Sequence, residues 1–254
     1  TAAILCKQTG AEIFPIDIGI AVDTKLENHK IAYGTKNMAK EPAMTREEAE
    51  RAMEVGIEKV RELSEQGYKI IATGEMGIGN TTTSSALASY FLQEDVEKMT
   101  GRGAGLTSKA LEKKIAVVRK AIADYSPAFT DAIDALAALG GFDIAGMAGV
   151  FLGGAIYRVP IVMDGFISST AALTATRICP ACKDFIMASH VSKEPAAEKI
   201  LAAMDKEAAL HCDMCLGEGT GAVTLFPILD LATQIYEQMS TFEDIEIDAY
   251  VELK

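Results

Sequence analysis

Apolar residues along this chain follow two different periods, and the segments with each period alternate. Short apolar runs rich in β-branched residues predict strands, and these runs lie at 13–22, 68–73, 159–163 and 185–188. Helical spacing of apolar positions predicts helices at 45–67, 82–91, 106–123, 132–139, 145–156 and 221–239. The helix from residue 45 has the clearest start, because Thr45-Arg46-Glu47-Glu48 has the form of a capping box. Strands alternating with helices predict an α/β fold, with an open, mainly parallel sheet covered by helices on both faces.

Length and charge narrow the classes of protein that fit. A chain of 254 residues favours a single main domain, residues 1–254. Its 24 Lys and Arg against 36 Asp and Glu give a net charge of −12, which opposes binding to nucleic acid or to an anionic membrane. No uninterrupted apolar run is long enough to cross a bilayer, and no leader-like segment opens the chain, so we expect a cytoplasmic protein.

A glycine-rich turn between a predicted strand and a predicted helix has the form of a phosphate cradle. It reads Gly74-Glu75-Met76-Gly77-Ile78-Gly79-Asn80-Thr81-Thr82. Glycines let the backbone approach a ligand, and the amides that open the next helix can donate to phosphate oxygens. Asn80 stands where a P-loop carries its lysine, so a monophosphate fits better than a triphosphate. A plain loop is the alternative on this turn alone.

Three further polar loops lie at ends of predicted elements, at 101–106, 189–195 and 216–221. In open α/β sheets such loops gather at the carboxyl ends of the strands, where ligands bind. Glu218 has glycine on both sides, so burial could raise its pKa toward the range of a general base; the alternative is a helix cap. His190 fits a ligand or acid as well as a structural histidine. Of Lys113 and Lys114, one could reach an anion, although a solvated helix face is the commoner role.

The cysteines leave two readings open. Of the five, four form the pairs Cys179-x-x-Cys182 and Cys212-x-x-Cys215. Paired CxxC units are typical of four-thiolate zinc sites, but the separation between these pairs exceeds that of common zinc ribbons. A chain of this length also needs no structural metal to fold. We therefore predict free thiols and no metal site.

Five motifs occur in one order along the chain, and together they resemble a known family. The motifs are GEMGIGNTT, GRGAGL, VPIVMDGFI, ASHVSKEP and LGEGTGA. They are similar to those of nicotinate-nucleotide:dimethylbenzimidazole phosphoribosyltransferases, over residues 11–242. The resemblance implies a Rossmann-like α/β domain with a small helical part and a homodimer. It also implies transfer of the phosphoribosyl group of nicotinate mononucleotide to 5,6-dimethylbenzimidazole, giving α-ribazole 5'-phosphate and nicotinate without a cofactor.

The resemblance also implies roles for individual residues. Glu218 matches the general base, Glu75 a second catalytic carboxylate, and Lys114 the lysine that follows the GRG loop. Substrate-binding positions in the matching motifs are Gly77, Gly79, Asn80, Thr81, Thr82, Gly101, Arg102, Gly103, Ser192 and Gly217. Attack opposite the leaving group would invert C1', converting a β-nucleotide to the α-anomer.

Three departures from the family pattern bear on the acceptor. A family segment that precedes residue 1 and contributes to the acceptor pocket is absent, while Cys215 and Ala197 replace an arginine and a histidine of many relatives. Adenine, other benzimidazoles or phenolic bases are therefore alternative acceptors. A nucleotide-binding but inactive fragment or partner subunit is the alternative function.

Overall fold

Three short parallel strands carry the loops predicted to form the site. In the computed structural model, which describes residues 1–248, β3 (Ile71–Ala72), β4 (Ile161–Met163) and β5 (Ile186–Ala188) pair in the order β3-β4-β5. The predicted single domain, 1–254, thus ends outside the described residues. All three strands were predicted from apolar runs, although two of the runs are longer than the strands they contain.

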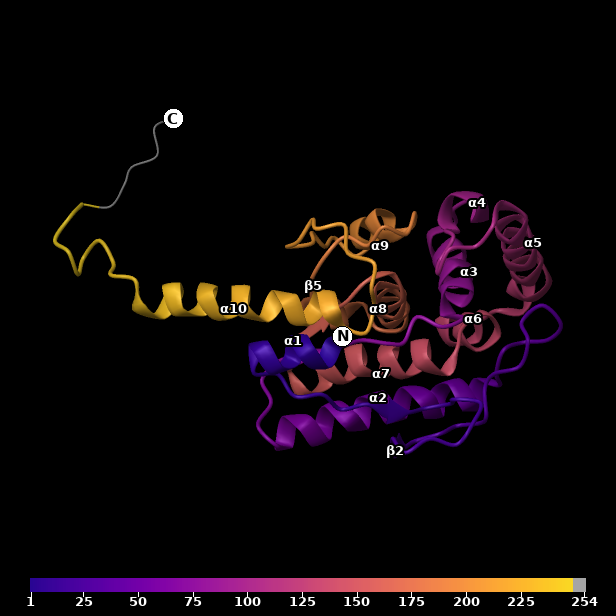
Figure 1. Ribbon diagram of the computed structural model, residues 1–254, viewed down its shortest axis with the longest axis horizontal. Coiled ribbons are helices and arrows are strands. Elements are labelled where there is room, and N and C mark those ends of the chain that lie inside the picture. The colour runs from indigo at the N-terminus through magenta and orange to yellow at the C-terminus, as the bar shows by residue number, and fades with distance from the viewer. Residues whose placement is uncertain (249–254) are drawn as a thin grey trace.

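Helices cover both faces of this sheet, because side chains along β4 alternate between two cores. Ile161 and Met163 pack into the main core, which includes residues of α7 (Phe142–Tyr157) and α8 (Phe166–Ile178). Val162 points to the other face and packs in a smaller cluster with residues of α10 (Thr220–Gln238). The predicted α/β class, with a parallel sheet between helical layers, is confirmed (Figure 1).

Helical spacing located the long helices well, and the shorter or more polar ones were not predicted. The remaining predicted helices are α2 (Arg46–Glu65), α3 (Asn80–Leu92), α5 (Ser108–Tyr125) and α6 (Ala132–Leu139). Not predicted were α1 (Ala2–Thr9), α4 (Val96–Met99), α8, α9 (Ala197–Ala203) and the 3-10 turns Ser126–Ala128 and Pro180–Phe185. The capping box of α2 is present, with Thr45 Oγ1 accepting from Glu48 N–H and the Glu48 carboxylate accepting from Thr45 N–H.

The predicted strand at 13–22 is wrong over most of its length. Only β1 (Ile16–Asp17) is extended and paired, with β2 (Glu27–Asn28) as its parallel neighbour. The reason is the buried carboxylate of Asp17, which accepts hydrogen bonds from the amides of Gly19 and Ile20 and from Lys30 Nζ at 2.7 Å. These bonds turn the chain immediately after Asp17, and its ion pair with Lys30 is among the causes that lower the pKa of this carboxyl to about 2.

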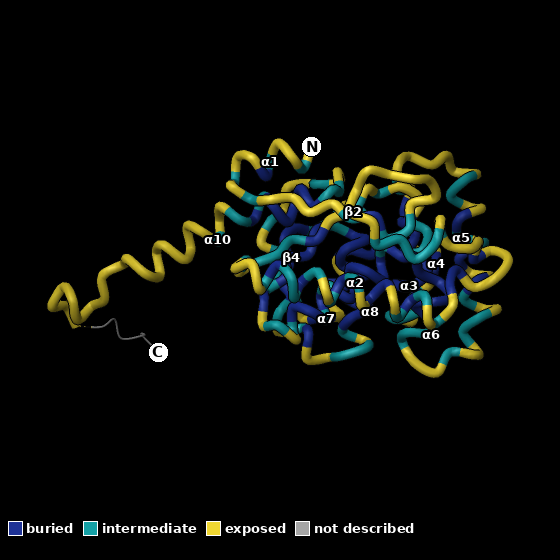
Figure 2. The backbone as a smooth tube through the Cα atoms, turned by 90° about the horizontal axis from the view of Figure 1, so that it is seen from below, coloured by how far each residue is buried: buried dark blue, intermediate teal, exposed yellow. Residues whose placement is uncertain are grey.

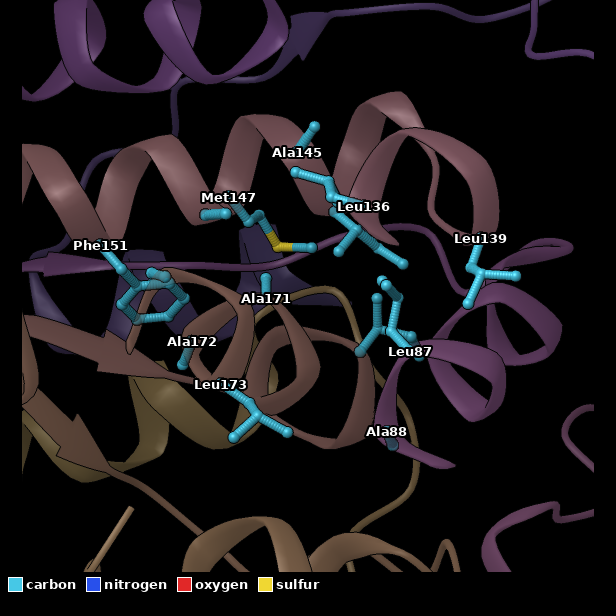
Figure 3. Packing of buried hydrophobic residues seen from close by; sticks show 14 of the residues in the cluster. Leu87, Ala88, Leu136, Leu139, Ala145, Met147, Phe151, Ala171, Ala172 and Leu173 are labelled. Atoms are coloured by element: carbon cyan, nitrogen blue, oxygen red, sulfur yellow. The ribbon is translucent and has the colours of Figure 1, made fainter. Parts of the chain in front are cut away.

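The main core joins α3, α6, α7 and α8, as Figure 3 shows for Leu87, Leu136, Met147 and Ala171. Outside this cluster, α2 and α7 approach so closely that glycine is required where they cross. A Cβ added to Gly149 would lie 2.0 Å from the carbonyl oxygen of Met53. Small residues therefore set the spacing between these two helices.

We expect Gly149→Ala to destabilise the protein by about 2 kcal/mol, because overpacking outweighs the gain in helix propensity. Urea unfolding followed by circular dichroism measures this. Gly153→Ala is the matched control in the same helix: its added Cβ would lie 3.0 Å from Val60 Cβ, so the cost should be smaller. A Gly149→Ala protein as stable as the wild type would contradict the packing described.

The second half of α10 extends away from the body of the protein (Figure 1). Its residues are exposed there, whereas the first turns of the helix are buried against the sheet (Figure 2). Pro227 lies within this helix, as expected from the sequence. Within the described chain, we find no helix with the length and apolar character needed to cross a membrane.

Candidate functional site

Two loops from distant parts of the sequence meet at the carboxyl end of the sheet. The loop after β3 contains Glu75, and the loop before α10 contains Glu218. Glu218 N–H donates to the carbonyl oxygen of Glu75 at 2.9 Å. A Cβ on Gly74 would lie 2.5 Å from the backbone nitrogen of Gly219. The two loops are thus in direct backbone contact, and both carboxylates belong to one site.

The first carboxylate, Glu75, is held by the start of α3. It accepts hydrogen bonds from the amide of Gly77 and from Asn80 Nδ2, the latter at 2.8 Å. Asn80 Nδ2 also donates to Asp143 Oδ2 at 2.8 Å, so one amide group holds two carboxylates. Burial, with smaller contributions from the charges of Asp143 and Asp164, raises the pKa of Glu75 above its ordinary value. Negative charge is therefore concentrated here.

The second cluster of the site surrounds Lys114, which is only 6% exposed. Its Nζ donates to Thr81 Oγ1 and to the carbonyl oxygen of Gly101, both at 3.0 Å. Burial lowers the pKa of Lys114, and the charge of Glu194 opposes this shift. The sequence left Lys113 and Lys114 as alternatives; the structure buries Lys114 and leaves Lys113 exposed. Because Thr81 follows Asn80, this cluster adjoins the carboxylates.

The glycine loop at 101–106 closes on the start of α3. A Cβ on Gly103 would lie 2.8 Å from Thr81 Oγ1, and one on Gly101 would overlap the carboxylate of Glu194. The loop at 189–195 therefore joins the same cluster. Arg102 is used differently from the prediction, because its guanidinium donates to the carbonyl of Leu106 and to Ser108 Oγ within its own loop. Ser192 is half-buried, and its Oγ accepts from the Glu194 amide at 3.4 Å.

The N-terminus of α3 is open to an anion. Gly77 and Gly79 have φ of 72° and 79°, a backbone conformation that side chains rarely adopt. No side chain caps the helix at Gly79, so the amides of its first turn, up to Thr82, lack that usual partner. This arrangement provides donors and a favourable helix dipole for a phosphate group beside Lys114.

Glu218 has a different electrostatic environment from the one expected. Burial was expected to raise its pKa, but its side chain is 32% exposed and its Oε2 lies 2.9 Å from the Thr1 ammonium. Ala2 N–H also donates to Oε2, at 3.1 Å. These contacts lower the pKa of Glu218. The carboxylate is thus ionised and faces outward, where it accepts N–H donors.

Two buried residues behind the carboxylates had no predicted role as a pair. Asp164, at the end of β4, accepts from the amides of Gly219, Gly221 and Ala222 at the start of α10. His190 Nδ1 lies 3.9 Å from Asp164 Oδ1 and 3.0 Å from Ser189 Oγ. Burial lowers the pKa of His190, and the charge of Asp164 opposes this. The sequence signal for Asp164 was its place after an apolar strand.

The cysteines do not form a cluster with other ligand types. All five are free, with Cys182 buried and Cys212 and Cys215 exposed. Burial raises the pKa of Cys182 to about 12. Among residues 1–248, no group of three or more His, Cys, Asp or Glu side chains could hold a metal ion.

The site therefore has two chemically different parts that share the start of α3. One part, around Lys114, Thr81 and the open helix end, suits an anion such as a phosphate group. The other part presents Glu75, Asp143 and Glu218, which suit a cationic centre and a proton to be accepted. A substrate with an anionic end and a reacting centre that gains positive charge would match this polarity.

Comparisons with known proteins agree with this polarity. The family model for phosphoribosyltransferase matches residues 1–247. The nicotinate-nucleotide–dimethylbenzimidazole phosphoribosyltransferase of Clostridium acetobutylicum is 52% identical, with 99% of this chain and 72% of that protein covered. The protein of the same name from Acetivibrio thermocellus is 50% identical over 96% of this chain and 70% of its own. The crystal structure of CobT from Thermus thermophilus has a TM-score of 0.93 at 34% identity, covering 98% of this chain and 75% of that one.

Proposed function

The chain belongs to the nicotinate-nucleotide–dimethylbenzimidazole phosphoribosyltransferase family, and we propose from this premise how it carries out the reaction of that family. In this proposal it takes the phosphoribosyl group of nicotinate mononucleotide and transfers it to 5,6-dimethylbenzimidazole or a related base. The products are α-ribazole 5'-phosphate and nicotinate. A homodimer in the cytoplasm remains part of the proposal, as the family resemblance implies.

The phosphate of the nucleotide binds at the start of α3. Gly77 and Gly79 keep the backbone open, and the amides that follow, together with Thr81, are the donors. Lys114 adds a positive charge that is already oriented by Thr81 and by the Gly101 carbonyl. Gly103 and Ser192 line the loops on either side. A buried, oriented lysine loses little side-chain entropy when the anion binds.

The acceptor base binds on the Glu218 side. Apolar side chains are exposed near both carboxylates: Met76 is 71% exposed, Ile78 82% and Leu216 56%. Such surface suits a flat aromatic ring, which buries apolar area while its ring N–H faces an acceptor. Thr1 N and Ala2 N occupy donor positions on Glu218 Oε2, so an incoming ring N–H would exchange with them.

The reaction needs one bond made, one broken and one proton moved. The unprotonated ring nitrogen of the acceptor attacks C1', and the bond from C1' to the pyridinium nitrogen breaks, so that nicotinate leaves with the electron pair. The proton on the other ring nitrogen passes to the Glu218 carboxylate. Attack on the face opposite the leaving group inverts C1' to the α-anomer.

Glu75 and Asp143 stabilise the positive charge that develops on the ribose. Both are held by Asn80 Nδ2, so their negative charge is fixed before the reaction and no reorganisation is needed. The contact that supports the proposal most is the backbone hydrogen bond from Glu218 N–H to the Glu75 carbonyl. It places the proposed base and the charge-stabilising carboxylate in one unit.

Nicotinate release tests the proposed activity. The protein is incubated with nicotinate mononucleotide and dimethylbenzimidazole, and nicotinate and the ribosylated base are separated by chromatography. We expect both products in equal amounts, and no nicotinate when the acceptor is omitted. Binding of the nucleotide without any turnover would instead support the inactive alternative, in which the phosphate loops serve only to bind.

Lys114→Met should raise the KM for nicotinate mononucleotide by about tenfold, because a charge-assisted contact to the phosphate is lost. The neighbouring Lys113→Met is the matched control, since Lys113 is exposed on the same helix and should leave the KM unchanged. Initial rates at several nucleotide concentrations measure both. Equal KM values in the two variants would remove Lys114 from the phosphate site.

A further inference from the structure

The start of α10, where Glu218 lies, is held by a single buried carboxylate. Asp164 is only 1% exposed. Its Oδ2 accepts from Gly219 N–H at 3.2 Å, and its Oδ1 accepts from Gly221 N–H at 2.8 Å and from Ala222 N–H at 3.2 Å. Both carboxylate oxygens are therefore directed at the backbone that immediately follows Glu218.

Glu218 needs such support because its backbone is strained. It has φ of 60°, between Gly217 at 77° and Gly219 at 78°. A glutamate in the left-handed region costs about 1 kcal/mol or more, and persists only where its surroundings determine it. The Glu75 carbonyl fixes the Glu218 amide on one side. Asp164 fixes the next amides on the other side.

Asp164 is itself fixed by the elements around it. Its own N–H donates to Ser168 Oγ at 3.1 Å, at the start of α8, and Ser168 Oγ is hydrogen-bonded to Thr73 Oγ1. His190 closes the remaining side, because a Cβ on Gly221 would lie 2.0 Å from its Nδ1. The carboxylate thus connects the ends of β3 and β4 to the loop of the proposed base.

We propose that Asp164 is a positioning residue, which acts on the reaction by holding Glu218 in its strained conformation and in reach of the acceptor. The proposal rests on the proposed function, in which Glu218 takes the acceptor's proton. Asp164 itself contacts backbone amides and no reacting atom. Loss of its hold should therefore affect the proton-transfer step and leave the phosphate end of the site, around Lys114, unchanged.

Asp164→Asn removes this hold with little change in shape. An amide offers one acceptor oxygen in place of two, so either the Gly219 amide or the pair at Gly221 and Ala222 would face an N–H donor. We expect kcat to fall by about 10- to 100-fold, as for the loss of a hydrogen bond to a charged group. The affinity for nicotinate mononucleotide should change by less than about threefold, which is within half a decade on the same scale. Asp124→Asn, on the exposed face of α5, is the control.

A double-mutant cycle with Glu218→Gln separates positioning from a general structural defect. If Asp164 acts through Glu218, Asp164→Asn should cause no further loss of kcat in the Glu218→Gln protein. Residual rates are followed over hours by chromatography. Ser168→Ala provides a milder variant should Asp164→Asn fold poorly, with a smaller loss of kcat that is likewise absent beside Glu218→Gln.

The outcomes are distinct. Multiplicative losses in the double variant, with Glu218→Gln alone strongly impaired, would overturn the role of Asp164 and leave the proposed function intact. A Glu218→Gln protein with wild-type turnover would overturn both, since Asp164 would then have no base to position. A rise in the dissociation constant of the nucleotide parallel to the loss of kcat would also contradict the inference.

Discussion

Glu218→Gln lowers kcat by about 10²- to 10⁴-fold, the range expected when a general base is removed. Glutamine has nearly the same shape and still fits the strained loop, but it cannot accept the proton of the acceptor. Nicotinate mononucleotide binds as before, because its phosphate contacts lie at the start of α3. Initial rates and isothermal titration with the nucleotide measure the two quantities separately. Glu207→Gln, at an exposed position, is the matched control.

The pH dependence of this rate carries a further signature of Glu218. The Thr1 ammonium lowers the pKa of the carboxyl, so the base is ionised above that lowered value and is lost as the pH falls through it. In the wild type, kcat/KM should therefore decline only below the pKa of an ordinary glutamate, after correction for titration of the acceptor. This acidic limb should be missing in Glu218→Gln. A variant that keeps both the rate and the limb would contradict the assignment.

Gly74→Ala should lower kcat by about 100-fold or more, since a shift of about 1 Å in a catalytic group can cost that much. The added Cβ would lie 2.5 Å from Gly219 N and 2.7 Å from the Glu218 carbonyl carbon. Backbone atoms cannot rotate away, so the Glu218 loop must move. The φ of Gly74 lies outside the left-handed range, so the steric overlap is the main effect.

Gly153→Ala is the control for Gly74→Ala, because it crowds the packing of α2 and α7 and leaves the loops in place. It should reduce stability and leave kcat unchanged, whereas Gly74→Ala should reduce kcat at temperatures where the protein is folded. Circular dichroism confirms folding before the rates are compared. Wild-type turnover by Gly74→Ala would show that the contact between the two loops has no role in the reaction.

The sequence predicted the elements whose local signals agree with their packing. The capping box at Thr45 located α2, and apolar spacing located α6 with the bounds that the structure has. The helix α8 was not predicted, because serine and threonine favour turns and strands in isolation. In the structure their hydroxyls donate to carbonyls one turn back, as Ser169 does to Gly165 and Thr170 to Phe166. Tertiary burial therefore decides the conformation of this segment.

The candidate site was predictable as a set of motifs and not as a geometry. Motif order indicated Glu75, Lys114 and Glu218, because each lies in a loop or helix that follows a strand or a glycine turn. The roles of Asp143 and Asp164 depend on contacts across 63 and 55 residues of sequence, which no local pattern reveals. The pKa of Glu218 was wrong for the same reason, since its partner is Thr1.

A crystal structure of the complex with nicotinate mononucleotide tests the central claim most directly. We expect the phosphate against the amides that follow Gly79, within hydrogen-bond distance of Thr81 and Lys114. The C1' atom should lie between this cluster and the Glu218 carboxylate, with the face opposite nicotinate open toward that carboxylate. A phosphate bound elsewhere, or a C1' whose open face is turned away from Glu218, would contradict the account.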